Sequence, residues 1–98
     1  MIRRLIVRPE AEAELLDAAQ WYQRQREGLG VEFLSALDLT FDAIRQRPTW
    51  FPFAHADVRR ALVKRFPYAV YFLLNSRKMT VVAIRHTARR NRDLEERA

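Results

Sequence analysis

The sequence predicts an α+β domain in which an N-terminal strand and an antiparallel helical hairpin pack on a three-stranded antiparallel meander. Two patterns predict this class. Apolar residues recur every three to four positions in the first half of the chain, which is the helical period. After Val58 they alternate or run together in short stretches, which is typical of strands. Since 98 residues that are 49% hydrophobic suffice for one core, we expect a single domain spanning residues 1–98.

The first two elements are a short strand and a helix that begins at Pro9. An apolar run predicts the strand: Ile2, Leu5 and Val7. Pro9 suits the first helical position, where a missing N–H leaves no hydrogen bond unmade. Apolar residues then recur on one helical face: Ala11, Leu15, Ala18 and Tyr22. We expect Gly28 and Gly30 to supply the left-handed conformation that ends this helix.

A second helix is predicted from about Val31 to Gln46. Its apolar residues are spaced by three, four and three positions: Leu34, Leu37, Phe41 and Ile44. Pro48 ends the pattern. Because the connection between the helices is very short, they must pack antiparallel. The loop at residues 48–57 holds three large aromatic residues, which we expect to plug one end of the core.

Three strands are predicted in the remainder: Val58–Phe66, Ala69–Asn75 and Met79–His86. The short turns between them imply an antiparallel meander. The middle strand is apolar on both faces, with Val70, Phe72 and Leu74 on one and Tyr71 and Leu73 on the other. The helical hairpin should cover one face. The remaining C-terminal segment, residues 89–98, is short for covering the other, so the pattern points to a partner.

Positive charge is concentrated in the last two fifths of the chain. The net charge is +6, yet residues 1–57 carry −2 and residues 58–98 carry +8. This asymmetry favours an acidic partner, either nucleic acid or an acidic polypeptide, over a basic surface that serves only solubility. The chain has no cysteine, which excludes disulfides and thiolate metal sites. We expect a soluble cytoplasmic protein without a signal peptide, membrane span, metal or cofactor.

Three segments carry a resemblance to a known family. They are WYQRQREGLGVEFL (21–34), RRALVKRFPYAVYF (59–72) and VVAIRHTARRNRDL (81–94). Over essentially the whole chain the sequence resembles the RelE/ParE toxins of type II toxin–antitoxin systems, in particular members described as plasmid-stabilisation proteins. The resemblance implies a growth-inhibiting toxin neutralised by a cognate antitoxin, which the adjacent gene encodes and whose C-terminal part wraps over the toxin. A homodimer, or a heterotetramer with antitoxin, would fit this arrangement.

The resemblance leaves two targets open. RelE-like members cleave messenger RNA on the ribosome, and ParE-like members inhibit DNA gyrase. Metal-independent RNA cleavage needs a general base, a general acid and cations for the phosphate. The catalytic candidates for that reaction are His86, Arg85, Arg60 and Lys64. However, the chain has no tyrosine after His86 and no closely spaced lysine pair, both of which depart from the RelE-like pattern. These departures favour the ParE-like reading.

The same basic half supplies the candidate surface for the target or the antitoxin. Its residues are Arg59, Arg60, Arg65, Tyr71, Leu73, Arg85, Arg89 and Arg90. A further alternative, independent of the resemblance, is a small basic nucleic-acid-binding module that stacks bases on aromatic residues. Trp21, Trp50, Phe51 and Phe53 would serve. This alternative ranks last, because the aromatic residues lie outside the basic half of the sequence.

Overall fold

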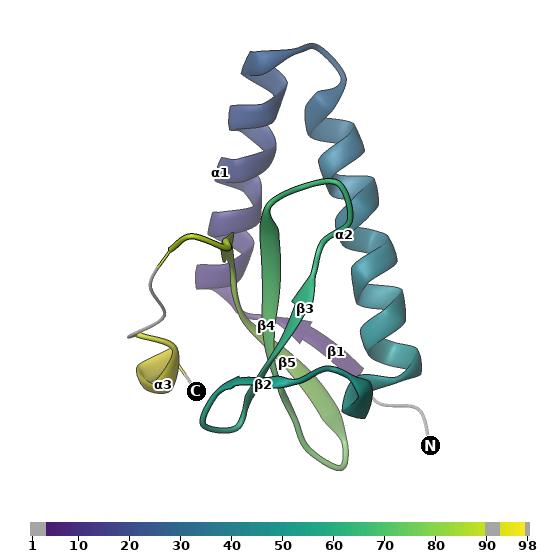
Figure 1. Ribbon diagram of the computed structural model, residues 1–98, viewed down its shortest axis with the longest axis vertical. Helices are drawn as coiled ribbons and strands as arrows, with labels where there is room; N and C mark the ends of the chain where they lie inside the picture. Colours follow the sequence, from purple (N-terminus) through teal and green to yellow (C-terminus); the bar gives the residue numbers. More distant parts are fainter. Residues whose placement is uncertain (1–3, 90–92, 98) are drawn as a thin grey trace.

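A computed structural model describes residues 4–89 and 93–97 of the chain (Figure 1). A helical hairpin packs on one face of a five-stranded sheet whose strand order is β1-β5-β4-β3-β2. The expected α+β class is confirmed. The elements in chain order are β1 (Arg4–Val7), α1 (Pro9–Gln25), α2 (Leu29–Gln46), the 3-10 helix η1 (Pro48–Trp50), β2 (Phe53–His55), β3 (Val58–Leu62), β4 (Tyr68–Leu74), β5 (Lys78–His86) and α3 (Leu94–Arg97).

The predicted meander forms the centre of a larger, mixed sheet. β3, β4 and β5 are antiparallel neighbours, as predicted. β1 lies parallel to β5, with Leu5 opposite Met79, and the helical hairpin carries the chain from β1 at one edge of the sheet to β2 at the other. β2 pairs with β3 at the other edge. The prediction of a loop throughout residues 48–57 is therefore wrong at Phe53–His55, which is too short a segment for a period of two to stand out.

The helical hairpin depends on two glycines that act differently. Gly28 has the predicted positive φ, of 90°, but it lies directly before α2 as its N-cap, three residues past the end of α1. Gly30 lies inside α2 instead, so its expected left-handed role is wrong. A Cβ atom at Gly30 would lie 2.6 Å from the backbone oxygen of Ala19 in α1. Gly30 thus lets the two helices approach closely, and α2 begins at Leu29, two residues earlier than predicted.

The main core lies between the hairpin and the sheet. Phe33, Leu37 and Ile44 of α2 are buried against the helix-facing residues of the strands, among them Val70 and Phe72. At one end of this core, rings pack at centroid distances of 4.9–6.0 Å: Tyr22, Phe33, Phe66 and Tyr68. The predicted aromatic plug is only partly realised. Phe51 packs on Phe72, whereas Trp50 stays 72% exposed.

A second, smaller core lies on the opposite face of the sheet, which we call the open face. Tyr71 is 0% exposed there and packs in one cluster with Val58, Ala83 and Leu94. Leu94 belongs to α3, so the C-terminal segment covers the middle of this face. The expectation that Tyr71 would lie on an uncovered surface is wrong for this reason. Leu73 is only partly buried at the margin of the cluster.

Neither of the two long helices among the described residues combines the length and the apolar character that crossing a membrane requires.

Candidate functional site

A groove of about 280 Å³ lies between α1 and the ends of β4 and β5, and three of the sequence-predicted residues line it: Arg85, His86 and Arg89. One wall of the groove consists of polar and aromatic side chains of α1, among them Glu14, Asp17 and Trp21. β4 and β5 contribute the floor. The lining residues are Glu14, Asp17, Ala18, Trp21, Tyr68, Ile84, Arg85, His86 and Arg89.

The inner wall of the groove is an ion-pair network, which we call the Glu14 cluster: Glu14, Arg85, Arg89, Asp93 and Arg97. Arg85 is only 2% exposed and donates two hydrogen bonds to Asp93, at 2.7 and 3.2 Å. Nη2 of Arg85, which bonds Asp93, also contacts a carboxylate oxygen of Glu14 at 3.3 Å. Glu14 also accepts from Arg97 at 2.8 Å and pairs with Arg89 at 3.5 Å. The hydrogen bond from Arg85 lowers the pKa of Asp93 to about 2.

This geometry corrects the expectation for Arg85. A guanidinium held by two carboxylates in the interior is already neutralised, so it cannot serve as a surface cation for a phosphate or a partner. The backbone N–H of Ile84 also donates to Glu14, at 3.1 Å, and Arg97 donates to the carbonyl oxygen of Val82. The Glu14 cluster therefore joins α1, β5 and the C-terminal segment, which is a structural task.

His86 lies at the exposed outer end of the groove. Its ring meets the ring of Tyr68 edge-on, with centroids 5.6 Å apart, and its Nδ1 accepts a hydrogen bond from the backbone N–H of Ala88 at 3.0 Å. A neutral imidazole that accepts at Nδ1 carries its proton on Nε2. Burial raises the pKa of Tyr68, which keeps its hydroxyl protonated at neutral pH. His86 is thus oriented and exposed, which a general acid or base requires.

The four catalytic candidates do not meet at one place. Arg60 lies opposite Tyr71 in the β3–β4 register, which puts its side chain on the open face. His86 lies opposite Tyr68, whose ring packs on the helix side. Lys64 follows the end of β3, in the turn before β4, and lines neither the groove nor a shared pocket with His86. Arg60 and His86 therefore lie on opposite faces of the sheet, and the four candidates do not form one catalytic site.

Arg59 and Arg65 make contacts within the chain. Arg59 donates to the carbonyl oxygen of Phe51 at 2.8 Å and lies over the ring of Phe53, 4.1 Å from its centroid. Arg65 pairs with Glu32 at 2.9 Å. Hydrogen bonds from Arg65 and then Arg26 lower the pKa of the Glu32 carboxyl. Arg89 is exposed beside the groove. Arg90 lies outside the described residues.

What remains accessible on the open face is a small apolar and basic surface. Leu62 is 61% exposed, and Leu73 and Arg60 are partly exposed next to the buried Tyr71. Leu62 and Arg60 belong to β3, near the β2 edge of the sheet. An exposed leucine beside an arginine without an ion-pair partner among the described residues suits an acidic, amphipathic segment of another protein.

The structure brings aromatic residues and cations together in a way that the sequence did not indicate. Arg47 lies over the ring of Trp50, and Arg59 lies over that of Phe53, each at 4.1 Å from the centroid. The aromatic loop and the basic half, which are separate in the sequence, therefore lie side by side in the structure. The nucleic-acid-binding alternative no longer ranks last on that ground. Sheet pairing of β2 with β3 brings the two parts of the chain together.

Sequence reasoning missed three polar or aromatic groove residues, Glu14, Asp17 and Tyr68, and named Trp21 only as a candidate for stacking bases. A signal for Glu14 was present. It lies three residues after Ala11 and four before Ala18, which places a carboxylate on the buried stripe of α1. A carboxylate in that position needs a cationic partner, and the basic second half supplies it. Among the described residues, no group of three or more His, Asp or Glu side chains is arranged to hold a metal ion.

Comparison with solved structures identifies the fold. The chain superposes on a chain of the chromosomal ParDE TA system from P. aeruginosa with a TM-score of 0.66 and 15% sequence identity. The match covers 87% of this chain and 96% of that chain. The chain has the RelE/ParE toxin fold. Neither a family model nor a curated protein sequence matches it.

The RelE/ParE fold expected from the sequence resemblance is thus confirmed, while the site has to be argued from this chain's own side chains. At 15% identity a shared backbone carries few shared side chains. Within the RelE/ParE-like fold of this chain, the accessible candidates are His86 and Arg89 at the groove and Arg60, Leu62 and Leu73 on the open face.

Proposed function

We propose that this protein is the toxin of a type II toxin–antitoxin system, that a cognate antitoxin neutralises it in the cytoplasm, and that it inhibits growth by binding DNA gyrase as ParE-like toxins do. The observation that carries the proposal is the fold shared over 87% of the chain with a chain of a ParDE TA system. The sequence resemblance over residues 21–34, 59–72 and 81–94 supports it independently.

The geometry supports a binding toxin over a ribonuclease. Arg85 is buried in ion pairs with Glu14 and Asp93, and Arg60 lies on the other face of the sheet from His86. A phosphodiester-cleaving site needs its acid, base and cations within hydrogen-bond reach of one phosphate. A protein that acts by binding needs only an accessible surface.

For the antitoxin we propose the open face as the binding surface. Leu62 and Leu73 provide apolar contacts, and Arg60, two residues before Leu62 on β3, provides a cation beside them. An amphipathic antitoxin segment with carboxylates beside its apolar residues would complement this surface.

A second candidate function, RelE-like cleavage of messenger RNA, retains one specific observation in its favour. His86 is exposed in a groove with Arg89, which has a cationic head group able to reach a phosphate, and with Asp17 on the facing helix. An imidazole and a guanidinium at one groove are two of the parts that the reaction uses.

Expression of the gene alone and together with its immediate neighbour tests the proposal. We expect growth arrest that the neighbouring gene product relieves. In the arrested cells, DNA breaks that depend on gyrase would support the ParE-like target, and codon-positioned cleavage of messenger RNA would replace it with the RelE-like one. Absence of arrest with a folded protein would contradict the toxin proposal.

Single substitutions separate the surfaces in the same assay. Leu62→Asp should weaken binding of the antitoxin at least tenfold, because it puts a carboxylate against an acidic partner, and rescue by the neighbour should fail. Arg24→Ala is the matched control, since Arg24 is an exposed cation of α1 without an ion pair among the described residues. His86→Ala should leave the arrest unchanged, and loss of arrest would favour the nuclease.

A further inference from the structure

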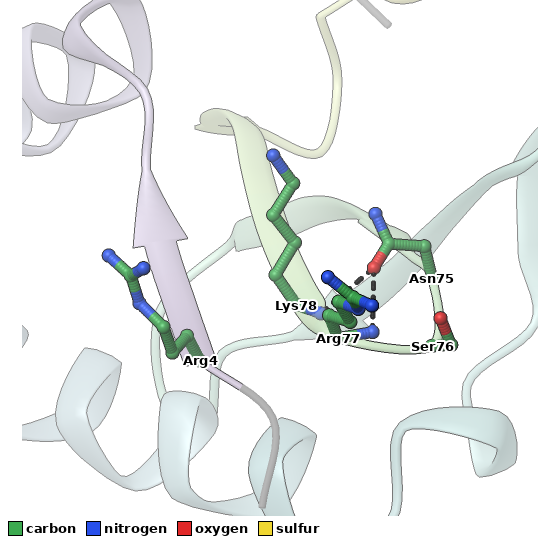
Figure 2. A pocket seen from close by; sticks show the side chains of 5 residues that line it. All are labelled: Arg4, Asn75, Ser76, Arg77 and Lys78. Atoms are coloured by element: carbon green, nitrogen blue, oxygen red, sulfur yellow. Dashed lines mark hydrogen bonds between the residues drawn. The ribbon is translucent and has the colours of Figure 1, made fainter.

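A second hollow, of about 450 Å³, lies far from the groove, at the end of the sheet where the β4–β5 turn meets the start of β1 (Figure 2). Its lining consists of Arg4, Asn75, Ser76, Arg77 and Lys78, which we call the basic hollow. Parallel pairing holds the two sides together. Arg4 lies opposite Lys78 in the β1–β5 register, and the backbone N–H of Arg4 donates to the carbonyl oxygen of Arg77 at 3.2 Å.

The β1–β5 register also places the side chains of Arg4 and Lys78 on the same face of the sheet. Residues opposite one another in a sheet have side chains on the same face, and Figure 2 shows Arg4 and Lys78 extending in the same direction from their strands. Leu5 and Met79, the next pair, belong to the main core, so Arg4 and Lys78 extend on the open side. Arg77 is exposed and lies in the β4–β5 turn, directly before Lys78.

Asn75 completes a lining that presents hydrogen-bond donors. Its Oδ1 accepts from the backbone N–H groups of both Arg77 and Lys78, each at 2.9 Å (Figure 2). Because the oxygen is occupied in this turn, the Nδ2 amide points away from the turn and presents two N–H donors. The hydroxyl of Ser76 can donate as well. The hollow has no carboxylate in its lining.

Other cations on the described surface are either paired, as Arg65 is with Glu32 and Arg45 with Asp42, or lie singly, as Arg24 and Arg60 do. In the basic hollow, by contrast, three cations without an ion pair are neighbours. Arg4, Arg77 and Lys78 form no ion pair with any part of residues 4–89 and 93–97. Three adjacent cations without a counter-charge repel one another, and an anion would remove that repulsion.

We propose that the basic hollow is a phosphate-binding site for a nucleic-acid strand. Arg4 and Arg77 would each offer a guanidinium fork to phosphate oxygens, and Lys78 would add a point charge. The amide of Asn75 would donate to the same oxygens. The site uses no residue of the groove and none of Arg60, Leu62 and Leu73, so its test is independent of the proposed function.

Exposed aromatic residues favour a polynucleotide over a small polyphosphate as the source of the phosphates. Along the long axis of the molecule, η1 with Trp50 lies toward the same end as the β4–β5 turn, at the bottom of Figure 1. Trp50 and Phe53 are both largely exposed, and each has an arginine over its ring. Single strands combine phosphates with bases that stack on such rings, whereas inorganic polyphosphate offers only charge.

Fluorescence anisotropy with a labelled 15-nucleotide single strand, at several salt concentrations, tests the site in the purified full-length protein. If three phosphates are neutralised, the affinity should fall with salt with a logarithmic slope of about −2. The variant R77A/K78A should lose at least tenfold in affinity, and its slope should fall to about −0.7. Arg24→Ala combined with Arg45→Ala removes the same charge elsewhere and should change the affinity less than threefold.

Asn75→Asp is the sharper variant, since an aspartate keeps both acceptor bonds of the turn but replaces the amide donors with negative charge. It should match R77A/K78A in loss of binding while unfolding at the same urea concentration as the wild type. Competition by inorganic tripolyphosphate that is as strong as competition by unlabelled strand would keep the phosphate site but overturn the nucleic-acid ligand. No binding at low salt, or an equal loss in the control variant, would overturn the site.

Discussion

At the scale of single residues, Glu14 and Arg85 determine how the second half of the chain attaches to the first. Glu14 lies on the buried stripe of α1 and Arg85 near the end of β5, and neither is stable in the interior alone. Together with Asp93 they form a buried network in which each charge has an opposite partner. Arg85, a catalytic candidate in the sequence, therefore stabilises the fold.

Arg85→Ala should lower the free energy of unfolding by about 1–3 kcal/mol, because Asp93 loses its closest cation, whereas Glu14 keeps Arg97 and Arg89. Urea denaturation followed by tryptophan fluorescence measures this. Arg24→Ala should stay within about 0.5 kcal/mol of the wild type. If Arg85→Ala reduced toxicity at unchanged stability, Arg85 would belong to the working surface after all.

At the scale of elements, the helical hairpin and the C-terminal segment with α3 each depend on a few specific contacts. In the hairpin, Gly30 lets α2 approach the carbonyl oxygen of Ala19. In α3, the side chain of Leu94 is fully buried against Tyr71 and Val82, and Asp93 just before it binds Arg85. These contacts hold α2 against α1 and the C-terminal segment against the open face.

Gly30→Ala should destabilise the protein by about 1–3 kcal/mol, since a Cβ atom 2.6 Å from a backbone oxygen forces the helices apart. Helix propensity alone would predict the opposite sign, a gain of about 1 kcal/mol. Thermal unfolding of the variant decides between the two effects. Gly28→Ala is the comparison, in which open space but a φ of 90° should cost about 1 kcal/mol. A more stable Gly30→Ala protein would contradict the close packing.

The attachment of α3 should weaken in acid. The pKa of Asp93 is lowered to about 2, mainly by the hydrogen bond from Arg85, from an ordinary value of 3.8. A lowered carboxyl pKa contributes stability that is complete above pH 3.8 and is lost as the pH falls toward 2. Because the Asp93 side chain is 39% exposed, the contribution is about 1 kcal/mol after solvent screening.

Asp93→Asn tests this attachment. Above pH 4 the variant should be less stable than the wild type by about 1 kcal/mol, and the difference should shrink toward pH 2 as Asp93 of the wild type becomes protonated. Urea midpoints at several pH values give the comparison. A difference that stays constant across this range would mean that Asp93 does not titrate in contact with Arg85.

At the scale of the whole molecule, two long helices cover one face of the sheet. The four residues of α3 cover only part of the other face. The uncovered remainder, with Leu62 and Leu73, is where we place the antitoxin. The basic hollow lies at one end of the sheet, and the groove with His86 lies at the other end of β5, since Lys78 begins this strand and His86 ends it. The groove and the basic hollow are thus separate from each other.

Truncation after residue 92 should expose the second core and make the protein associate with itself. Loss of the fully buried Leu94 alone removes about 1.5–3 kcal/mol of apolar stabilisation, and Tyr71 would then face water. Light scattering coupled to size-exclusion chromatography should show larger species for the truncated chain than for the full chain at equal concentration. A shortening by Ala98 alone serves as the control. Equal masses for the two shortened chains would contradict the covering role of α3.

Most of the fold could be predicted, because local patterns carry it. The helical period, Pro9 and the short connection predicted a hairpin that the structure confirms, and the alternation after Val58 predicted β3, β4 and β5. β2 was missed because three residues cannot show a period. The role of Gly30 was missed because a helix-ending glycine and a close-packing glycine look alike in sequence.

The sequence by itself determined the fold class, the two helices, the central meander and the concentration of positive charge after residue 57. Only the tertiary structure decided which cations are available. Arg65 and Arg85 are paired within the chain, Arg60 lies on the open face, and Arg4 meets Lys78 only because β1 lies parallel to β5. Periodicity is a local property that neighbouring residues share, whereas the partner of a charge depends on which distant segments pack together.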